Sequence, residues 1–162
     1  MNAEASKEAR RIRDELPQIA TIVSQAQRDW REFVRTGDDA YLKATAYDLH
    51  GFYTGNEKVL ESVAGTIDDR VPRGENWHRA LLRQMCEEIS GVRPALFSSE
   101  AGDLLDEFLR FRHRIRNIYS FNLVPEKVQD LVERLPAALE RIGEELSDFA
   151  LFLEQAKEDV VT

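Results

Sequence analysis

Four arginines and a histidine fall within seven consecutive residues, at Arg110, Arg112, His113, Arg114 and Arg116. The chain has a formal net charge of −8, and it would stand at −12 without these four arginines. Cations crowded onto an acidic chain repel one another, and contact with a polyanion is the use that best explains such a cluster. The acidic pI of about 5.0 argues against general binding to bulk DNA, so any contact with nucleic acid must be local.

The same cluster also has a purely structural interpretation. Asp103, Asp106 and Glu107 precede the arginines by about one turn, at spacings of three and four residues that allow ion pairs along a helix. A solvated helix face with balanced charges would then need no ligand. Charge alone leaves both interpretations open.

The elements that must position these residues are helices. Apolar residues recur at alternating steps of three and four, which is typical of amphipathic helices, and no strand-length window alternates with a period of two. We expect Pro17 to kink or restart the first helix. The apolar stripes run over residues 12–33, 42–67, 104–118 and 128–153, and a shorter helix is expected over residues 75–89.

The breaks between the stripes have recognisable turn chemistry. Gly37 and Asp38 should end the first helix and cap the second, and Ser98 or Ser99 should cap the fourth. Pro125 should end a turn that begins at residue 121. The pattern predicts an all-α, antiparallel up-and-down bundle of four long helices and one short one, forming a single domain over residues 1–162.

The remaining composition narrows the class of protein. No apolar run approaches the ~20 residues of a membrane span, and the N-terminus has no signal-peptide pattern. The single cysteine, Cys86, excludes an intrachain disulfide and fits a reducing compartment, so we expect a cytoplasmic protein. Its apolar neighbours indicate a packed side chain rather than a nucleophile.

The arginine cluster resembles the active-site motif of HEPN-domain proteins, in particular HepT-like toxins. That motif is an arginine, four intervening residues, a histidine, one further residue and a tyrosine. Arg112 matches the arginine and Tyr119 the tyrosine, but Asn117 stands where the histidine is expected. Three further segments also resemble landmarks of HepT-like domains: residues 48–57, 75–78 and 92–94.

The resemblance implies a fold and a function. HepT-like proteins are helical bundles that form homodimers and bring two copies of the motif together. Many are toxins that cleave RNA without a metal or other cofactor, and a cognate minimal nucleotidyltransferase neutralises them as the antitoxin. In some such pairs the nucleotidyltransferase adenylylates the motif tyrosine, which here would be Tyr119.

The chemistry of the residues can be considered separately. RNA cleavage by the 2′-hydroxyl needs a proton acceptor, a proton donor and stabilisation of charge on the phosphoryl oxygens. An arginine suits the last task, so Arg112 is the candidate, with Arg116 in support. At ~100° per residue these two share a narrow stripe with Tyr119, whereas Asn117 lies ~140° from Arg112. A distorted helix end or a second subunit would have to supply Asn117.

Asn117 leaves the activity open. An amide does not titrate near neutral pH, although it can still orient a 2′-hydroxyl. His113, one turn earlier, could transfer the proton instead, or it could be a surface residue paired with an acidic neighbour. The alternative function is a catalytically inactive module that docks a nucleotidyltransferase, a nucleotide or RNA through the arginine cluster.

Other polar residues admit structural explanations. Glu75 and His78 have the spacing of half a di-iron site, but no second pair exists, so we expect no metal. His50, Tyr53 and Glu57 share one face of the second helix. They could form a buried polar cluster or the wall of the motif's cleft.

Overall fold

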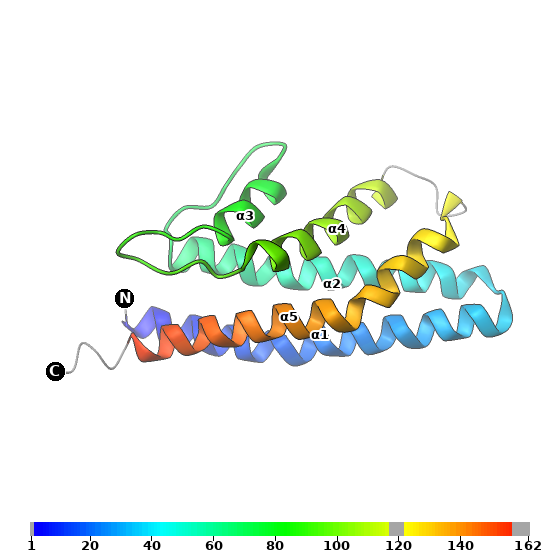
Figure 1. The fold of residues 1–162 in the computed structure, drawn as a ribbon, viewed down its shortest axis with the longest axis horizontal. Coiled ribbons are helices and arrows are strands. Elements are labelled where there is room, and N and C mark those ends of the chain that lie inside the picture. Colours follow the sequence, from blue (N-terminus) through cyan, green and yellow to red (C-terminus); the bar gives the residue numbers. More distant parts are fainter. Residues whose placement is uncertain (1, 117–121, 157–162) are drawn as a thin grey trace.

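The computed structural model describes residues 2–116 and 122–156, and within these ranges the protein is an all-α bundle (Figure 1). No β-strand occurs in the described ranges, which confirms the expected fold class; four helices are long and one is short. The helices are α1 (Asn2–Thr36), α2 (Asp39–Thr66), α3 (Trp77–Met85), α4 (Ser99–Arg116) and α5 (Pro125–Gln155).

The long helices alternate in direction along the bundle. In Figure 1, α1 and α2 form an antiparallel hairpin, α4 lies along α2, and α5 returns beside α1. The short α3 packs on α2 and α4 at one end of the molecule. The buried apolar side chains of the long helices and α3 form one hydrophobic core, as the three- and four-residue spacings predicted.

The turn between α1 and α2 follows the predicted chemistry. Gly37 has a φ of +69°, a conformation that glycine adopts without strain. The Asp38 side chain accepts a hydrogen bond from the backbone N–H of Ala40 at 2.9 Å and so caps α2. Ser98 caps α4 similarly, accepting from the N–H of Ala101.

Pro17 does not restart α1, which is continuous from residue 2 to residue 36. Of the two expected effects, a restart is therefore excluded, and a kink at Pro17 stays a prediction. The buried residues Ile12 and Ile19 on either side of the proline both join the core, so packing holds the helix together where its ladder loses one N–H donor.

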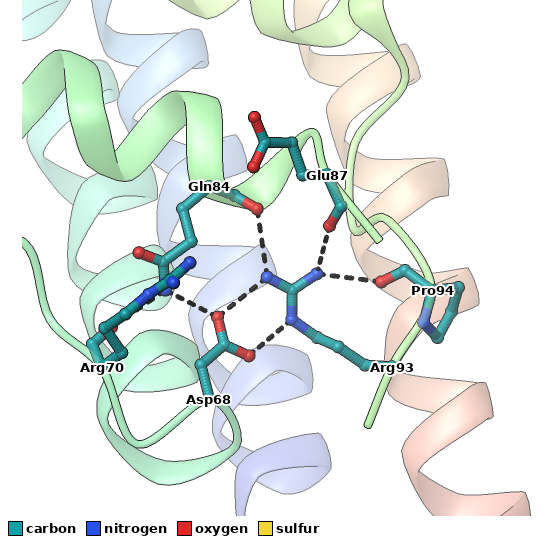
Figure 2. A network of polar contacts seen from close by, with 6 residues as sticks. All are labelled: Asp68, Arg70, Gln84, Glu87, Arg93 and Pro94. Atoms are coloured by element: carbon teal, nitrogen blue, oxygen red, sulfur yellow. Dashed lines mark hydrogen bonds and ion pairs between the residues drawn. The ribbon is translucent and has the colours of Figure 1, made fainter. Parts of the chain in front are cut away.

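The third helix is also shorter than the expected 75–89. Beyond Met85, the side chain of a later residue binds backbone carbonyls near the end of the helix. Arg93 is buried, and its guanidinium donates to the backbone carbonyls of Gln84 and Glu87 at 3.1 and 2.9 Å (Figure 2). Ile89 pairs with Arg93 in an isolated bridge. Carbonyls at the C-terminal end of α3 thus accept hydrogen bonds from the Arg93 guanidinium.

Arg93 also forms a fully buried ion pair with Asp68. Arg93 Nε and Nη2 donate to the two Asp68 oxygens at 2.6 and 2.8 Å, and both side chains have 0% exposure. The Gln84 amide also donates to Asp68 Oδ2 at 2.8 Å. Figure 2 shows this network, which ties the loops on both sides of α3 to each other.

Cys86 is a packed side chain, as its neighbours indicated. A Cβ placed on Gly102 of α4 would lie 2.6 Å from Cys86 Sγ, so the thiol fills the space that the glycine leaves. Burial raises the pKa of the Cys86 thiol, which disfavours the nucleophilic thiolate. Within the described ranges, no helix is both long enough and apolar enough to cross a membrane.

Candidate functional site

Arg112 is joined to α2 through a histidine. Its side chain leaves α4 half-buried, and Nε donates a hydrogen bond to His50 Nε2 at 3.1 Å. To accept this bond, His50 must carry a lone pair on Nε2 and its proton on Nδ1. The motif arginine therefore points toward the polar face of α2 and is held from there.

Arg112 forms part of the wall of a pocket of about 440 Å³ between α3 and α4. Arg110, His113 and Arg114, which were predicted to support the site, line it as well. The complete lining is Glu75, Asn76, His78, Arg79, Leu109, Arg110, Arg112, His113 and Arg114. Four arginines and two histidines against one carboxylate make it a site suited to an anion.

The structural interpretation of the arginine cluster holds for Arg110. Its Nη2 lies 2.6 Å from Asp106 Oδ2, one turn earlier, and the same carboxylate lies 3.8 Å from Arg79 Nε. Glu107 instead forms an ion pair with Arg134 of α5. Local acidic residues thus balance Arg110, whereas Arg112 has a neutral imidazole as its hydrogen-bond partner.

A second polar pair lies behind the pocket. His78 Nδ1 of α3 lies 2.6 Å from Glu57 Oε2 of α2, and their side chains are 19% and 5% exposed. The Tyr53 hydroxyl is buried nearby; burial, followed by the Glu57 carboxylate, raises its pKa. On this face of α2, Tyr53 and Glu57 are buried and His50 is half-buried. None of the three lines the pocket, but His50 and Glu57 contact Arg112 and His78, which do.

The basic surface continues on the other side of α4. A second hollow, of about 320 Å³, lies between α4 and α5, and Arg110 and Arg114 border both hollows. Its full lining is Glu107, Arg110, Phe111, Arg114, Lys127, Asp130, Leu131 and Arg134. Sequence reasoning missed Arg79, Lys127 and Arg134, because only tertiary packing brings other helices to the arginines.

The side chain of Arg116, together with Asn117 and Tyr119, lies outside the described residues, so the stripe shared by Arg112, Arg116 and Tyr119 stays a prediction. Among the described residues, no group of three or more histidine, cysteine or acidic side chains is gathered to hold a metal.

Comparison of the chain with protein families shows which family it belongs to. The family described as HepT-like protein matches residues 44–153. The chain belongs to the HepT-like family. This confirms the resemblance to the family that was based on the motif and on residues 48–57, 75–78 and 92–94. The matched range includes every residue that lines the pocket. Neither the curated proteins nor the solved structures compared with the chain gave a match.

Proposed function

We propose that this HepT-like protein is a toxin of a toxin–antitoxin pair that cleaves RNA without a metal, and that a cognate nucleotidyltransferase neutralises it. The observation that carries the proposal is the placement of Arg112. The motif arginine is fixed by His50 at the wall of a cationic pocket, where a phosphodiester could be bound.

In this proposal Arg112 binds the scissile phosphate and stabilises the charge that grows on its oxygens. A guanidinium held at Nε keeps its two terminal nitrogens for a phosphate, which suits paired hydrogen bonds. Arg110, Arg114 and His113 line the same pocket and would hold the neighbouring backbone.

The other motif residues complete the proposed site. Arg116 would support Arg112, Asn117 would orient the 2′-hydroxyl, and Tyr119 would help to hold the RNA. Since Asn117 lies ~140° around the helix from Arg112, a homodimer that joins two motifs would supply it from the second copy. Adenylylation of Tyr119 would add bulk and negative charge to a phosphate site and so block it.

The decisive test is cleavage of RNA in EDTA by the wild type and by Arg112→Ala, with Arg31→Ala as the matched control. Arg31 is an exposed arginine of α1 that does not line the pocket. We expect Arg112→Ala to lose at least ~100-fold in rate and Arg31→Ala to retain wild-type activity. Equal cleavage by Arg112→Ala would contradict the proposed role of the pocket.

Asn117 favours a second candidate function, a non-catalytic module that docks a nucleotidyltransferase, a nucleotide or RNA through the arginine cluster. This function predicts salt-dependent binding of a polyanion that weakens in Arg112→Ala, with no cleavage by the wild type. A mass spectrum of the protein co-expressed with the proposed cognate nucleotidyltransferase would show whether Tyr119 carries a nucleotide.

A further inference from the structure

We infer that His78 is the proton acceptor in RNA cleavage and that Glu57 is its positioning residue. This inference rests on the proposed function. It addresses a gap in the motif, because Asn117 cannot take up a proton near neutral pH and an imidazole can. His78 lies on a different helix from the motif and belongs to no part of it.

The geometry places His78 at the boundary between the core and the pocket. His78 lines the pocket together with Arg112, while Glu57 behind it is buried. With its proton on Nδ1, the ring donates to Glu57 Oε2 at 2.6 Å and carries a lone pair on Nε2. One ring nitrogen is thus fixed by the carboxylate, and the other is left to accept a proton.

The charges around the ring suit this role. The same pocket is lined by Arg79, Arg110, Arg112 and Arg114, whose positive charge a bound phosphate would offset, and by His113. Glu57 and the nearby Glu61 of α2, with Glu75 at the pocket, favour the imidazolium that forms. A buried carboxylate behind an imidazole is the arrangement that orients a general base and stabilises its charged form.

Contacts of the neighbouring residues also hold His78 in place. The network of Arg93 and Asp68 anchors the loops that flank α3, and the Trp77 ring lies 3.7 Å from the His78 ring, centroid to centroid. An alternative is that the Glu57–His78 pair only fastens α3 to α2. The experiment therefore needs measurements, such as a pH–rate profile, that would not change if the pair were purely structural.

The proposed reaction is an attack of the RNA 2′-hydroxyl on the neighbouring phosphorus. The 2′-oxygen of the RNA forms a bond to phosphorus and loses its proton to His78 Nε2. The bond between phosphorus and the 5′-oxygen breaks with its electron pair, and that oxygen takes a proton from solvent water. The products are a 2′,3′-cyclic phosphate and a 5′-hydroxyl, and the His78 imidazolium returns its proton to solvent.

The test uses His78→Gln, whose amide can still donate to Glu57 but cannot act as a base, and Glu57→Gln, which keeps the shape of the carboxylate. Glu4→Gln, at an exposed position of α1 that does not line the pocket, is the control for Glu57. Cleavage rate in EDTA is measured against pH, and affinity is measured with a 2′-deoxy oligonucleotide that cannot react.

We expect His78→Gln to cleave at least ~100-fold more slowly, to bind the oligonucleotide as the wild type does and to lose the acidic limb of the pH–rate profile. Glu57→Gln should be slower by roughly tenfold with a displaced acidic limb, and Glu4→Gln should match the wild type. Imidazole added to His78→Ala should restore part of the rate.

The outcomes separate this inference from the proposed function. If the wild type and His78→Gln cleave with the same rate and pH profile while Arg112→Ala is inactive, His78 is not the base and the ribonuclease function stands. His78 is likewise not the base if a smaller folded fraction of His78→Gln, measured by thermal unfolding, accounts for its whole loss of cleavage rate. If the wild type itself does not cleave, both the function and the inference are wrong.

Discussion

Arg112 of α4 and His50 of α2 are 62 residues apart in the sequence and are joined by a hydrogen bond of 3.1 Å from Nε to Nε2. A long, exposed arginine has many conformations to lose when it binds a phosphate. The contact with His50 restricts the side chain beforehand, so less conformational entropy remains to be lost on binding.

Replacement of His50 should therefore weaken the site without unfolding the protein. We expect His50→Leu to lower both RNA affinity and cleavage rate by roughly tenfold, because the bond that orients Arg112 is lost. His50→Gln, which has an amide oxygen that can accept from Arg112, should retain more activity than His50→Leu. Binding and cleavage by both variants are the measurements, and wild-type behaviour of His50→Leu would contradict the role given to His50.

Loss of Arg93 should cost far more stability than loss of an exposed arginine. In Arg93→Met the buried carboxylate of Asp68 loses its charged partner, and the carbonyls of Gln84 and Glu87 each lose a guanidinium donor. The free energy of unfolding should therefore fall by about 3–5 kcal/mol. Arg35→Met, which removes an exposed pair with Glu32, should cost less than about 1 kcal/mol. Urea unfolding measures both, and equal losses would show that the Arg93 network contributes little.

Asp48 should make the protein less stable as the pH rises. Burial, followed by the neighbouring carboxyl of Asp29, raises the pKa of Asp48 from 3.8 to about 7. Between these two values the folded protein holds a proton that the unfolded chain has released, so stability falls as pH increases through this window.

Asp48→Asn should flatten that dependence, because an amide has no proton to lose. We expect the difference in unfolding free energy between pH 5 and pH 8 to shrink in the variant relative to the wild type. Asp14→Asn, at an exposed position of α1, is the control. An unchanged pH dependence in Asp48→Asn would mean that this carboxyl does not titrate in the expected range.

Gly102→Ala should destabilise the protein, although alanine is favoured over glycine within a helix. The added Cβ would lie 2.6 Å from Cys86 Sγ, and we expect the overpacking to cost about 1–3 kcal/mol. Gly143→Ala, where nothing lies within 4 Å, should instead stabilise by up to ~1 kcal/mol. Thermal unfolding of the two single variants and of the double variant Gly102→Ala/Cys86→Ala tests this prediction. Adding Cys86→Ala should recover part of the stability that Gly102→Ala loses.

The fold was predictable because its signals are local. The three- and four-residue spacing, the glycine and aspartate at residues 37–38 and the serine cap at Ser98 each act within a few residues. The length of α3 was not predictable from such signals. It depends on Arg93, whose side chain reaches back to carbonyls of Gln84 and Glu87.

The candidate site was predictable only on α4. Arg110, Arg112, His113 and Arg114 were identified from their density in the sequence, and they do line one pocket. The pairing of His78 with Glu57 was not foreseen, because their separation of 21 residues has no periodic meaning until α3 packs on α2. The signals available in the sequence were His78 itself and the polar face that Glu57 shares with His50 and Tyr53 on the second helix.

The family match begins at residue 44, after the whole of α1 and the first residues of α2. Yet α1 covers α2 and α5 with side chains that are almost completely inaccessible to solvent, including Ile12, Ile19 and Val23. A truncated protein that started at residue 44 would lack these side chains, present the apolar surface beneath them to water and tend to aggregate. Recombinant work on the matched portion should therefore keep the leading helix, even though every residue around the pocket lies downstream of it.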